Sequence, residues 1–147
     1  ELTLRTWERD PRDKWLEGRS RIGRAGSFRQ QLDDQSSSFR ALCFTEQERR
    51  TSQSRSSGDP VIHLAARYAA KEALIKAWSS MRFGRPELLP NPNYREIEVI
   101  NDHVGRPRIK LHGQLSTHLS NHTIQLSLSH DGDYSTAVVM IIPGDQS

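Results

Sequence analysis

The residues from Asp59 to about Ser80 constrain the fold most, because they predict a single long helix. Asp59 can cap the first turn, and Pro60 suits the first helical position. The segment that follows, VIHLAARYAAKEALIKAW, contains neither glycine nor proline. Its apolar side is formed by residues at helical spacing, namely Val61, Leu64, Ala65, Tyr68 and Ile75. Such a helix needs a partner surface, which the remaining segments of the chain must supply.

Glu72 interrupts the apolar side of this helix. It follows Tyr68 by four residues and precedes Ile75 by three, so the three side chains share one face. A buried carboxylate needs a metal ion, a basic side chain or a proton, because an unpaired buried charge costs several kcal/mol. The alternative is an exposed ion pair with Lys76, which would contribute only a few tenths of a kcal/mol. Glu72 is therefore either a surface partner of Lys76 or a candidate metal ligand.

Basic side chains also lie on the neighbouring side of the helix. Arg67 and Lys71 are four residues apart and, having like charge, cannot neutralise each other. This side of the helix is predicted to face anions. The proline-rich stretch that follows the helix has no period and predicts a loop or lid that carries Arg82 and Arg85.

The other segments predict short strands around this helix. EIEVI (96–100) and RIKLH (108–112) flank turn residues and predict an antiparallel hairpin, and residues 113–121 predict a short helix. TIQLSLSH (123–130) alternates with Leu126 and Leu128 on its apolar face, to which His130 belongs by parity. AVVMII (137–142) predicts a strand buried on both faces. The expected class is α+β, with a long central helix packed on an antiparallel sheet.

Two features lie ahead of the helix. Thr45 and Glu48 have the spacing of a capping box, in which each side chain satisfies a backbone donor near the other. Residues 1–27 show no sustained period, and we predict an N-terminal segment of uncertain structure there, followed by one domain over residues 28–147.

Composition excludes several classes of protein. The 147 residues suffice for one core, and no run approaches the length of a membrane helix. Cys43 is the only cysteine, which excludes an internal disulfide and favours the reducing cytoplasm. The net charge of +3 favours an acidic partner. Nucleic acid is a poor candidate, because the few aromatic residues are not interleaved with the basic ones.

Four stretches, in matching order, resemble the holo-acyl-carrier-protein synthases. LAARYAAKEALIKAW (64–78) resembles the central helix of that family, whose hallmark is an aromatic residue, two small residues and Lys-Glu-Ala, followed by another lysine. FTEQER (44–49), EIEVINDHVGRPRIKLHG (96–113) and LSLSHDGDYSTAVV (126–139) agree in order and spacing. Four ordered segments are far more specific than a single Lys-Glu-Ala.

The resemblance implies a 4′-phosphopantetheinyl transferase fold and a Mg²⁺-dependent reaction in fatty acid biosynthesis. A serine of an apo acyl carrier protein would attack the β-phosphate of coenzyme A and release adenosine 3′,5′-bisphosphate. By matching positions, Glu72 would bind Mg²⁺, and Lys76 would stabilise the pyrophosphate or the attacking oxygen. Arg67 and Lys71 would hold phosphates of the nucleotide. Ser129 and His130 would contact the cofactor, although a histidine on an apolar face is as often a core residue.

The chain departs from the family at its start. The family's first strand carries a Gly-x-Asp whose aspartate is the second metal ligand, but here RSRIGRAG (19–26) places Arg21 about where that aspartate is expected. Either Glu72 with water and pyrophosphate holds the metal, or Asp13 or Glu17 completes the site. Two further explanations stay open: residues 1–26 are not the native start, or the protein is catalytically impaired.

The resemblance also implies partners. Family members form trimers with active sites between subunits, so a homotrimer is expected. The acidic carrier protein would be steered by basic residues, namely Arg24, Arg29, Arg40, Arg49 and Arg50. Two rival interpretations stay open: a catalytically impaired coenzyme A-binding relative, and a small basic nucleic-acid-binding protein.

Overall fold

The long central helix is present. The computed structural model describes residues 3–10, 14–16, 32, 38–54, 59–131 and 134–144. Helix α4 spans Pro60–Met81, and the backbone amide of Val61 donates to Oδ1 of Asp59 at 3.0 Å. Pro60 occupies the first helical position, where its missing amide hydrogen is no loss. The predicted cap and start are confirmed, and the helix ends within a few residues of the predicted end.

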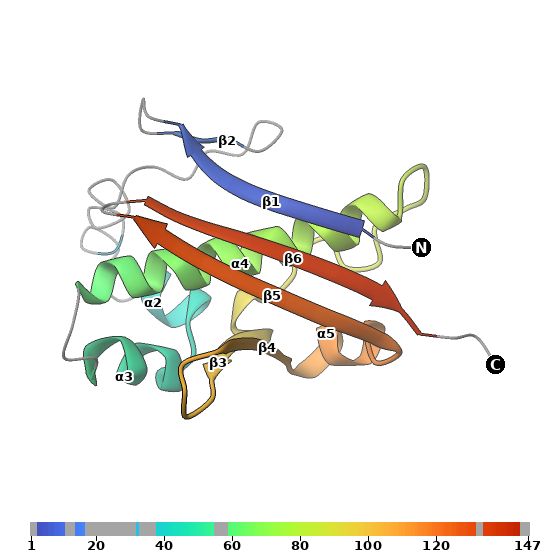
Figure 1. Ribbon diagram of the computed structural model, residues 1–147. Coiled ribbons are helices and arrows are strands. Elements are labelled where there is room, and N and C mark those ends of the chain that lie inside the picture. Colours follow the sequence, from blue (N-terminus) through green and yellow to red (C-terminus); the bar gives the residue numbers. More distant parts are fainter. Residues whose placement is uncertain are drawn as a thin grey trace.

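A four-stranded antiparallel sheet runs along this helix (Figure 1). Its strands are β1 (Thr3–Asp10), β2 (Lys14–Leu16), β5 (His122–Asp131) and β6 (Tyr134–Pro143), in the order β2-β1-β6-β5. Strand β5 is the one predicted from its alternating pattern. Strands β1 and β2 lie in the first 27 residues, where the sequence shows no sustained period. Strand β1 pairs with β6, so the domain boundary predicted at residue 28 falls between two strands of the same sheet.

The predicted hairpin and short helix are also present. Strand β3 (Ile97–Asn101) pairs with β4 (Pro107–Leu111), with Val99 opposite Ile109. The turn between them uses Gly105, whose φ of +87° favours glycine. Helix α5 (Gly113–His118) follows, and buries Leu115. Before α4 come α2 (Ser38–Cys43) and α3 (Glu46–Ser54), and the 3-10 helix η1 (Tyr94–Glu96) precedes β3.

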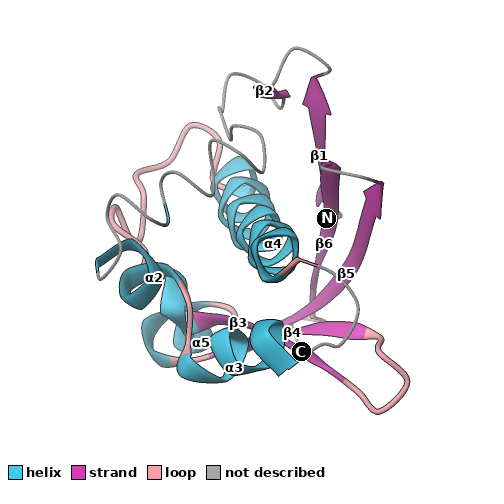
Figure 2. Cartoon of the chain, turned by 90° about the vertical axis from the view of Figure 1, so that its left-hand side faces the viewer, coloured by secondary structure: helices cyan, strands magenta, loops and turns pink. Residues whose placement is uncertain are grey.

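Helix α4 lies between the sheet and the remaining elements. Figure 2 shows the described helices on one side of the sheet, with α4 nearest to it. Its buried positions include four alanines whose small side chains allow close approach of neighbouring backbone, namely Ala69, Ala70, Ala73 and Ala77. They share one core cluster with side chains of β3, β4, α5 and β6. The predicted α+β class, with a long central helix on an antiparallel sheet, is confirmed.

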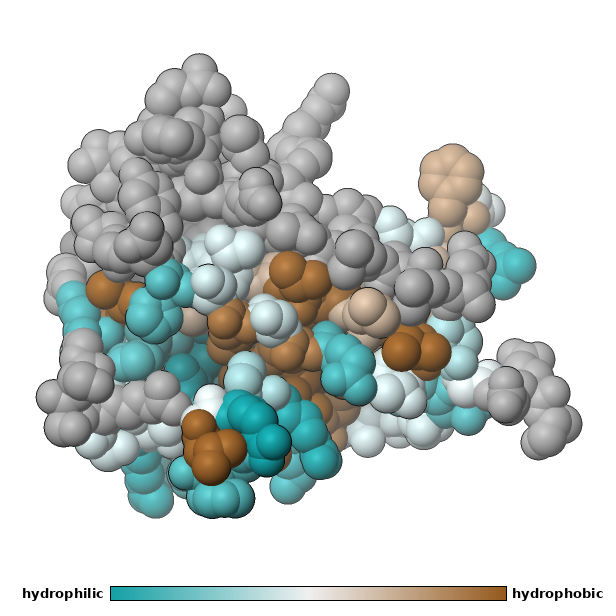
Figure 3. Space-filling model, in the orientation of Figure 1, coloured by the Kyte–Doolittle hydropathy of each residue, from teal (hydrophilic) through white to brown (hydrophobic). Residues whose placement is uncertain are grey.

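The prediction that β6 is buried on both faces is wrong. Ala137, Val139 and Ile141 are buried toward α4, whereas Val138 and Met140 on the other face are only half-buried. The reason is that within the chain no described element covers the outer face of the sheet. Apolar side chains reach the surface on this side of the molecule, shown in brown in Figure 3. Among the described helices, none combines the length and the apolarity needed to cross a membrane.

Candidate active site

Glu72 is held by a tyrosine from outside its own helix. Its carboxylate is half-buried, and the hydroxyl of Tyr94, the first residue of η1, donates a hydrogen bond to its Oε1. Tyr94 is placed there by Asn93, whose side chain caps η1 by accepting from the amide of Arg95 at 3.1 Å. The sequence did not predict a role for Tyr94. The proline-rich stretch that carries it has no helical or strand periodicity, so no pattern indicates that Tyr94 contacts Glu72.

The alternative of a surface ion pair between Glu72 and Lys76 is wrong. Lys76 is half-buried, and no ion pair joins it to Glu72. In the described part of the chain, no lysine or arginine forms an ion pair with Glu72. The contacts that the structure shows at this carboxylate come from tyrosine hydroxyls rather than from a basic side chain.

Aromatic rings surround this carboxylate. The ring centroids of Tyr68 and Tyr94 lie 5.7 Å apart, and those of Phe39 and Tyr68 lie 5.6 Å apart. Burial, followed by the negative charge of Glu72, raises the pKa of both Tyr68 and Tyr94 well above the usual value. Both phenols consequently stay protonated near neutral pH and remain hydrogen-bond donors toward Glu72.

A cavity of about 530 Å³ opens beside these tyrosines. Tyr68 and Tyr94 line it together with Cys43, Asn93 and Arg95. Burial raises the pKa of the Cys43 thiol to about 11, so the thiol is protonated and a poor nucleophile at neutral pH. The polar groups that line this cavity are therefore the two phenols and the side chains of Asn93 and Arg95.

Lys71 has a different role from the one predicted. It has no exposed surface, and its Nζ donates to Oε1 of Glu48 at 2.7 Å and to the carbonyl oxygen of Tyr94 at 3.0 Å. Burial lowers the pKa of Lys71, and the charge of Glu48 opposes this effect. The prediction that Lys71 binds a phosphate is corrected, because a buried, paired ammonium group cannot reach a ligand.

Glu48 carries more interactions than the predicted capping box. The box itself is confirmed, since the Thr45 amide donates to Oε1 of Glu48 and the Glu48 amide donates to Oγ1 of Thr45, at 3.0 and 3.2 Å. In addition, Oε2 of Glu48 accepts from the amide of Val99 at 3.1 Å. Glu48 thus links α3, α4 and β3, which a local motif could not reveal.

Arg67 lies one helical turn before Lys71. It is 3% exposed and donates to the carbonyl oxygen of His63 at 3.2 Å and to Oδ1 of Asn101 at 3.1 Å. These bonds orient its guanidinium group toward the end of β3. Its role with a nucleotide phosphate stays a prediction.

Ser129 and His130 lie near the end of β5, where the register places His130 opposite Ser135 of β6. Both are exposed, so the interpretation of His130 as a satisfied core residue is wrong. The parity was correct, but the strand extends beyond the core at this end. Figure 1 places this end of the sheet beside the first turns of α4, away from its C-terminal end. A contact between these two residues and the cofactor stays a prediction.

The residues proposed to replace the missing aspartate, Asp13 and Glu17, lie outside the described residues, as do Arg21, Arg24 and Arg29. In the described part of the chain, no three His, Cys, Asp or Glu side chains cluster in a way that could hold a metal ion. Magnesium is commonly bound by one or two carboxylates that share it with substrate phosphates and water. The Glu72 carboxylate, half-buried and without a basic partner among the described residues, fits such a shared site.

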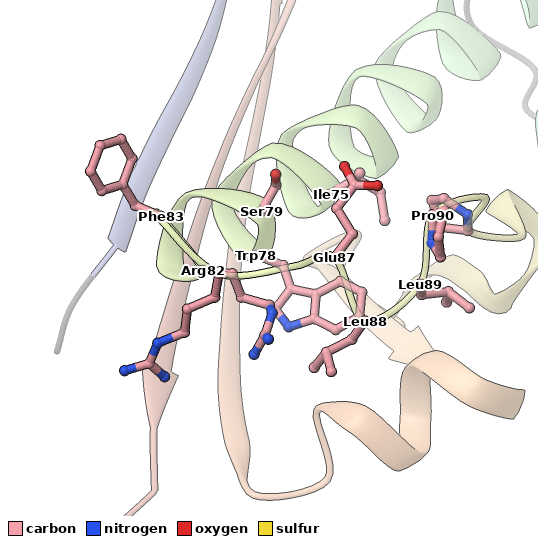
Figure 4. A pocket seen from close by; sticks show the side chains of 11 residues that line it. Ile75, Trp78, Ser79, Arg82, Phe83, Glu87, Leu88, Leu89 and Pro90 are labelled. Atoms are coloured by element: carbon pink, nitrogen blue, oxygen red, sulfur yellow. The ribbon is translucent and has the colours of Figure 1, made fainter.

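A second cavity, of about 340 Å³, lies between the last turns of α4 and the loop that follows (Figure 4). Figure 4 shows Trp78 and Leu88 beside each other in its lining, and Phe83 pointing away. Ile75, which precedes Lys76, also lines it, and Arg82 and Arg85 lie at the cavity. The predicted loop carrying two arginines therefore encloses a partly apolar space together with the last turns of α4.

Known proteins resemble this chain over most of its length. The sequence profile of the 4′-phosphopantetheinyl transferase superfamily matches residues 24–139. The holo-[acyl-carrier-protein] synthases of Mycobacterium ulcerans and Mycobacterium leprae are each 46% identical over 114 residues, which are 78% of this chain and 86% of the relative.

Solved structures agree with the sequence relatives. A Chronobacterium ammoniagenes ACPS–CoA complex is 33% identical with a TM-score of 0.78, covering 99% of both chains. The acyl carrier protein synthase of Mycobacterium tuberculosis is 33% identical with a TM-score of 0.68, covering 97% of this chain and 96% of that one. The predicted family and fold are confirmed: this chain belongs to the holo-[acyl-carrier-protein] synthases of the 4′-phosphopantetheinyl transferase superfamily.

Proposed function

We propose that this protein transfers the 4′-phosphopantetheine arm of coenzyme A to a serine of an apo acyl carrier protein, in fatty acid biosynthesis. The observation that carries the mechanism is the half-buried carboxylate of Glu72, which no basic side chain among the described residues neutralises. The relatives named above as holo-[acyl-carrier-protein] synthases, one of them solved with coenzyme A, support the choice of substrates.

The transfer needs charge neutralisation and alignment more than a covalent intermediate on the enzyme. The serine oxygen forms a bond to the β-phosphorus of coenzyme A, and the bond from this phosphorus to the bridging oxygen breaks. The serine proton passes to solvent water, and adenosine 3′,5′-bisphosphate leaves. Each new bond replaces one that breaks, so no oxidant or further co-reactant is required.

Glu72 and Lys76 are assigned the central roles. Glu72 would hold Mg²⁺, which neutralises charge on the diphosphate when bound. Lys76, one helical turn further along α4, makes no ion pair with a described residue and would stabilise the pyrophosphate or the attacking oxygen. The partly apolar cavity beside Ile75 and Trp78 suits the pantetheine arm in size and lining. Arg67, Ser129 and His130 would contact the nucleotide.

The partners would be an acidic carrier protein and two further copies of this chain. Among the arginines predicted to steer the carrier, Arg50 is exposed and pairs with Glu46, while Arg40 and Arg49 are half-buried. The half-buried apolar residues on the outer face of β6 support a homotrimer, because contact with another subunit would remove them from water. Active sites between subunits would then gain residues from two chains.

The direct test is a mass measurement on an apo carrier protein incubated with this protein, coenzyme A and Mg²⁺. We expect the carrier to gain the mass of the phosphopantetheine arm. Glu72→Gln, which keeps the size of the side chain and removes its charge, should be nearly inactive, and a chelator should stop the wild-type reaction. Full activity in the chelator, or in Glu72→Gln, would contradict the mechanism.

A second candidate is a relative that binds coenzyme A without transferring its arm. It is favoured by the finding that Glu72 has no cluster of further metal ligands beside it among the described residues. Calorimetric titration with coenzyme A separates the two candidates. Binding that is retained while the carrier gains no mass would select the impaired relative, whereas modification of the carrier would exclude it.

A further inference from the structure

Tyr94 is held at two points by two consecutive residues of α4. Its carbonyl oxygen accepts from Nζ of Lys71 at 3.0 Å, and its hydroxyl donates to Oε1 of Glu72. The backbone and the side-chain tip of Tyr94 are thus fixed against the same turn of one helix. Tyr94, which lies outside α4, is therefore held in a fixed position relative to that helix.

The first of these two points is itself anchored. Lys71 and Glu48 are both fully buried in their side chains, and 2.7 Å separates the ammonium nitrogen from the carboxylate oxygen. The Glu48 carboxylate also accepts from the backbone amides of Thr45 and Val99. The ion pair with Glu48, which is itself bonded to β3, fixes the ammonium group of Lys71. This group therefore donates to the Tyr94 carbonyl oxygen from a fixed position.

The ring of Tyr94 is restrained as well. It packs against Tyr68 at 5.7 Å between centroids, and Tyr68 packs in turn against Phe39 and Phe44. Rotation of the ring away from Glu72 would give up this contact. The backbone contact and the ring contact of Tyr94 therefore together hold its hydroxyl against one carboxylate oxygen of Glu72.

We propose that Tyr94 is a positioning residue for the metal site: its hydroxyl binds Oε1 of Glu72 and fixes the orientation in which this carboxylate faces the cation. This inference rests on the proposed role of Glu72. Magnesium demands near-ideal octahedral geometry, so a carboxylate with one oxygen fixed should bind it better than one free to rotate. Partners that orient a metal ligand commonly change metal affinity by about 10- to 100-fold.

The test is the variant Tyr94→Phe, which keeps the packed ring and removes only the hydroxyl. Mn²⁺ serves as the probe, and its binding to the protein with coenzyme A present is followed by electron paramagnetic resonance. We expect Mn²⁺ affinity to fall by about 10-fold. The Mg²⁺ concentration that gives half-maximal transfer should rise in parallel, while the rate at saturating Mg²⁺ changes little. A purely structural role would instead lower the melting temperature and leave metal affinity unchanged.

A double-mutant cycle with Glu72→Gln tests whether Tyr94 acts through this carboxylate. Adding Tyr94→Phe to Glu72→Gln should not weaken Mn²⁺ binding further. Unchanged Mn²⁺ affinity in Tyr94→Phe alone, or the same loss in both backgrounds, would overturn the inference. If Glu72→Gln binds Mn²⁺ as tightly as the wild type, the metal role of Glu72 fails instead, and the role of Tyr94 fails with it.

Discussion

Two lysines on one helix illustrate how burial decides the role of a side chain. Lys71 is fully buried and paired with Glu48, whereas Lys76, five residues later, is half-buried and has no ion pair in the described part of the chain. Their sequence contexts are similar, since both lie in the Lys-Glu-Ala-Leu-Ile-Lys stretch. Only the packing of α3 and η1 against the first lysine makes it structural.

Lys71→Met should strongly destabilise the protein. The substitution leaves the buried carboxylate of Glu48 without its cation, and breaking a buried pair from one side costs about 3 to 5 kcal/mol. Urea denaturation followed by circular dichroism measures this loss. Lys76→Met is the matched control on the same helix and should change the free energy of unfolding by no more than about 0.5 kcal/mol. Equal stability of the two variants would refute the structural role of Lys71.

At the level of elements, local signals specify the start of α4. Asp59 accepts from the backbone amide of Val61, and Pro60 supplies a preset φ for the first turn. The same first turns carry Leu64 and Ala65 into the core. A correctly placed start determines which residues face the sheet further along, including the position of Glu72 relative to η1.

Asp59→Ala should shorten or fray this start. Loss of the cap is expected to lower the free energy of unfolding by about 1 kcal/mol, which is typical of an N-cap. Thermal denaturation detects the change as a lower melting temperature. Asp59→Asn is the control, because asparagine accepts the same hydrogen bond and should retain most of the stability. If both variants were equally destabilised, charge rather than capping would explain the effect.

For the whole molecule, the main feature is the face of the sheet that no described element of the chain covers. Helix α4 covers one face, while Val138 and Met140 remain half-buried on the other. Their strand neighbours on this face include Gln125 and Ser127, so the surface is mixed rather than wholly apolar. This mixed face of the sheet can be exposed to water in the folding monomer and then be buried when subunits assemble.

Met140→Glu should therefore dissociate the proposed trimer. A carboxylate without a partner is costly to bury between subunits. Sedimentation should show the 16.8 kDa mass of one chain in place of three times that mass. Transfer activity should fall as well, if each site needs two chains. Thr117→Glu, on the exposed side of α5, is the control and should remain trimeric. A monomeric wild type would contradict the proposal.

The sequence by itself determined the central helix, the β3–β4 hairpin, strand β5 and the family. These features follow from local patterns, because capping, turn chemistry and periodicity act between residues a few positions apart. The strands in the first 27 residues were missed, since their residues show no alternating pattern. Strand β6 was predicted as buried on both faces, because an apolar run does not reveal how many of its sides are covered.

Only the tertiary structure decided what lies against the site. The partner of Lys71 is 23 residues away in the chain, and the partner of Glu72 is 22 residues away. Periodicity reports which side of an element is buried, but not which side chain of another element meets it there. The roles of Tyr94 and Glu48 thus follow from how α3, α4 and η1 pack together. This packing depends on the shapes and charges of side chains throughout the core.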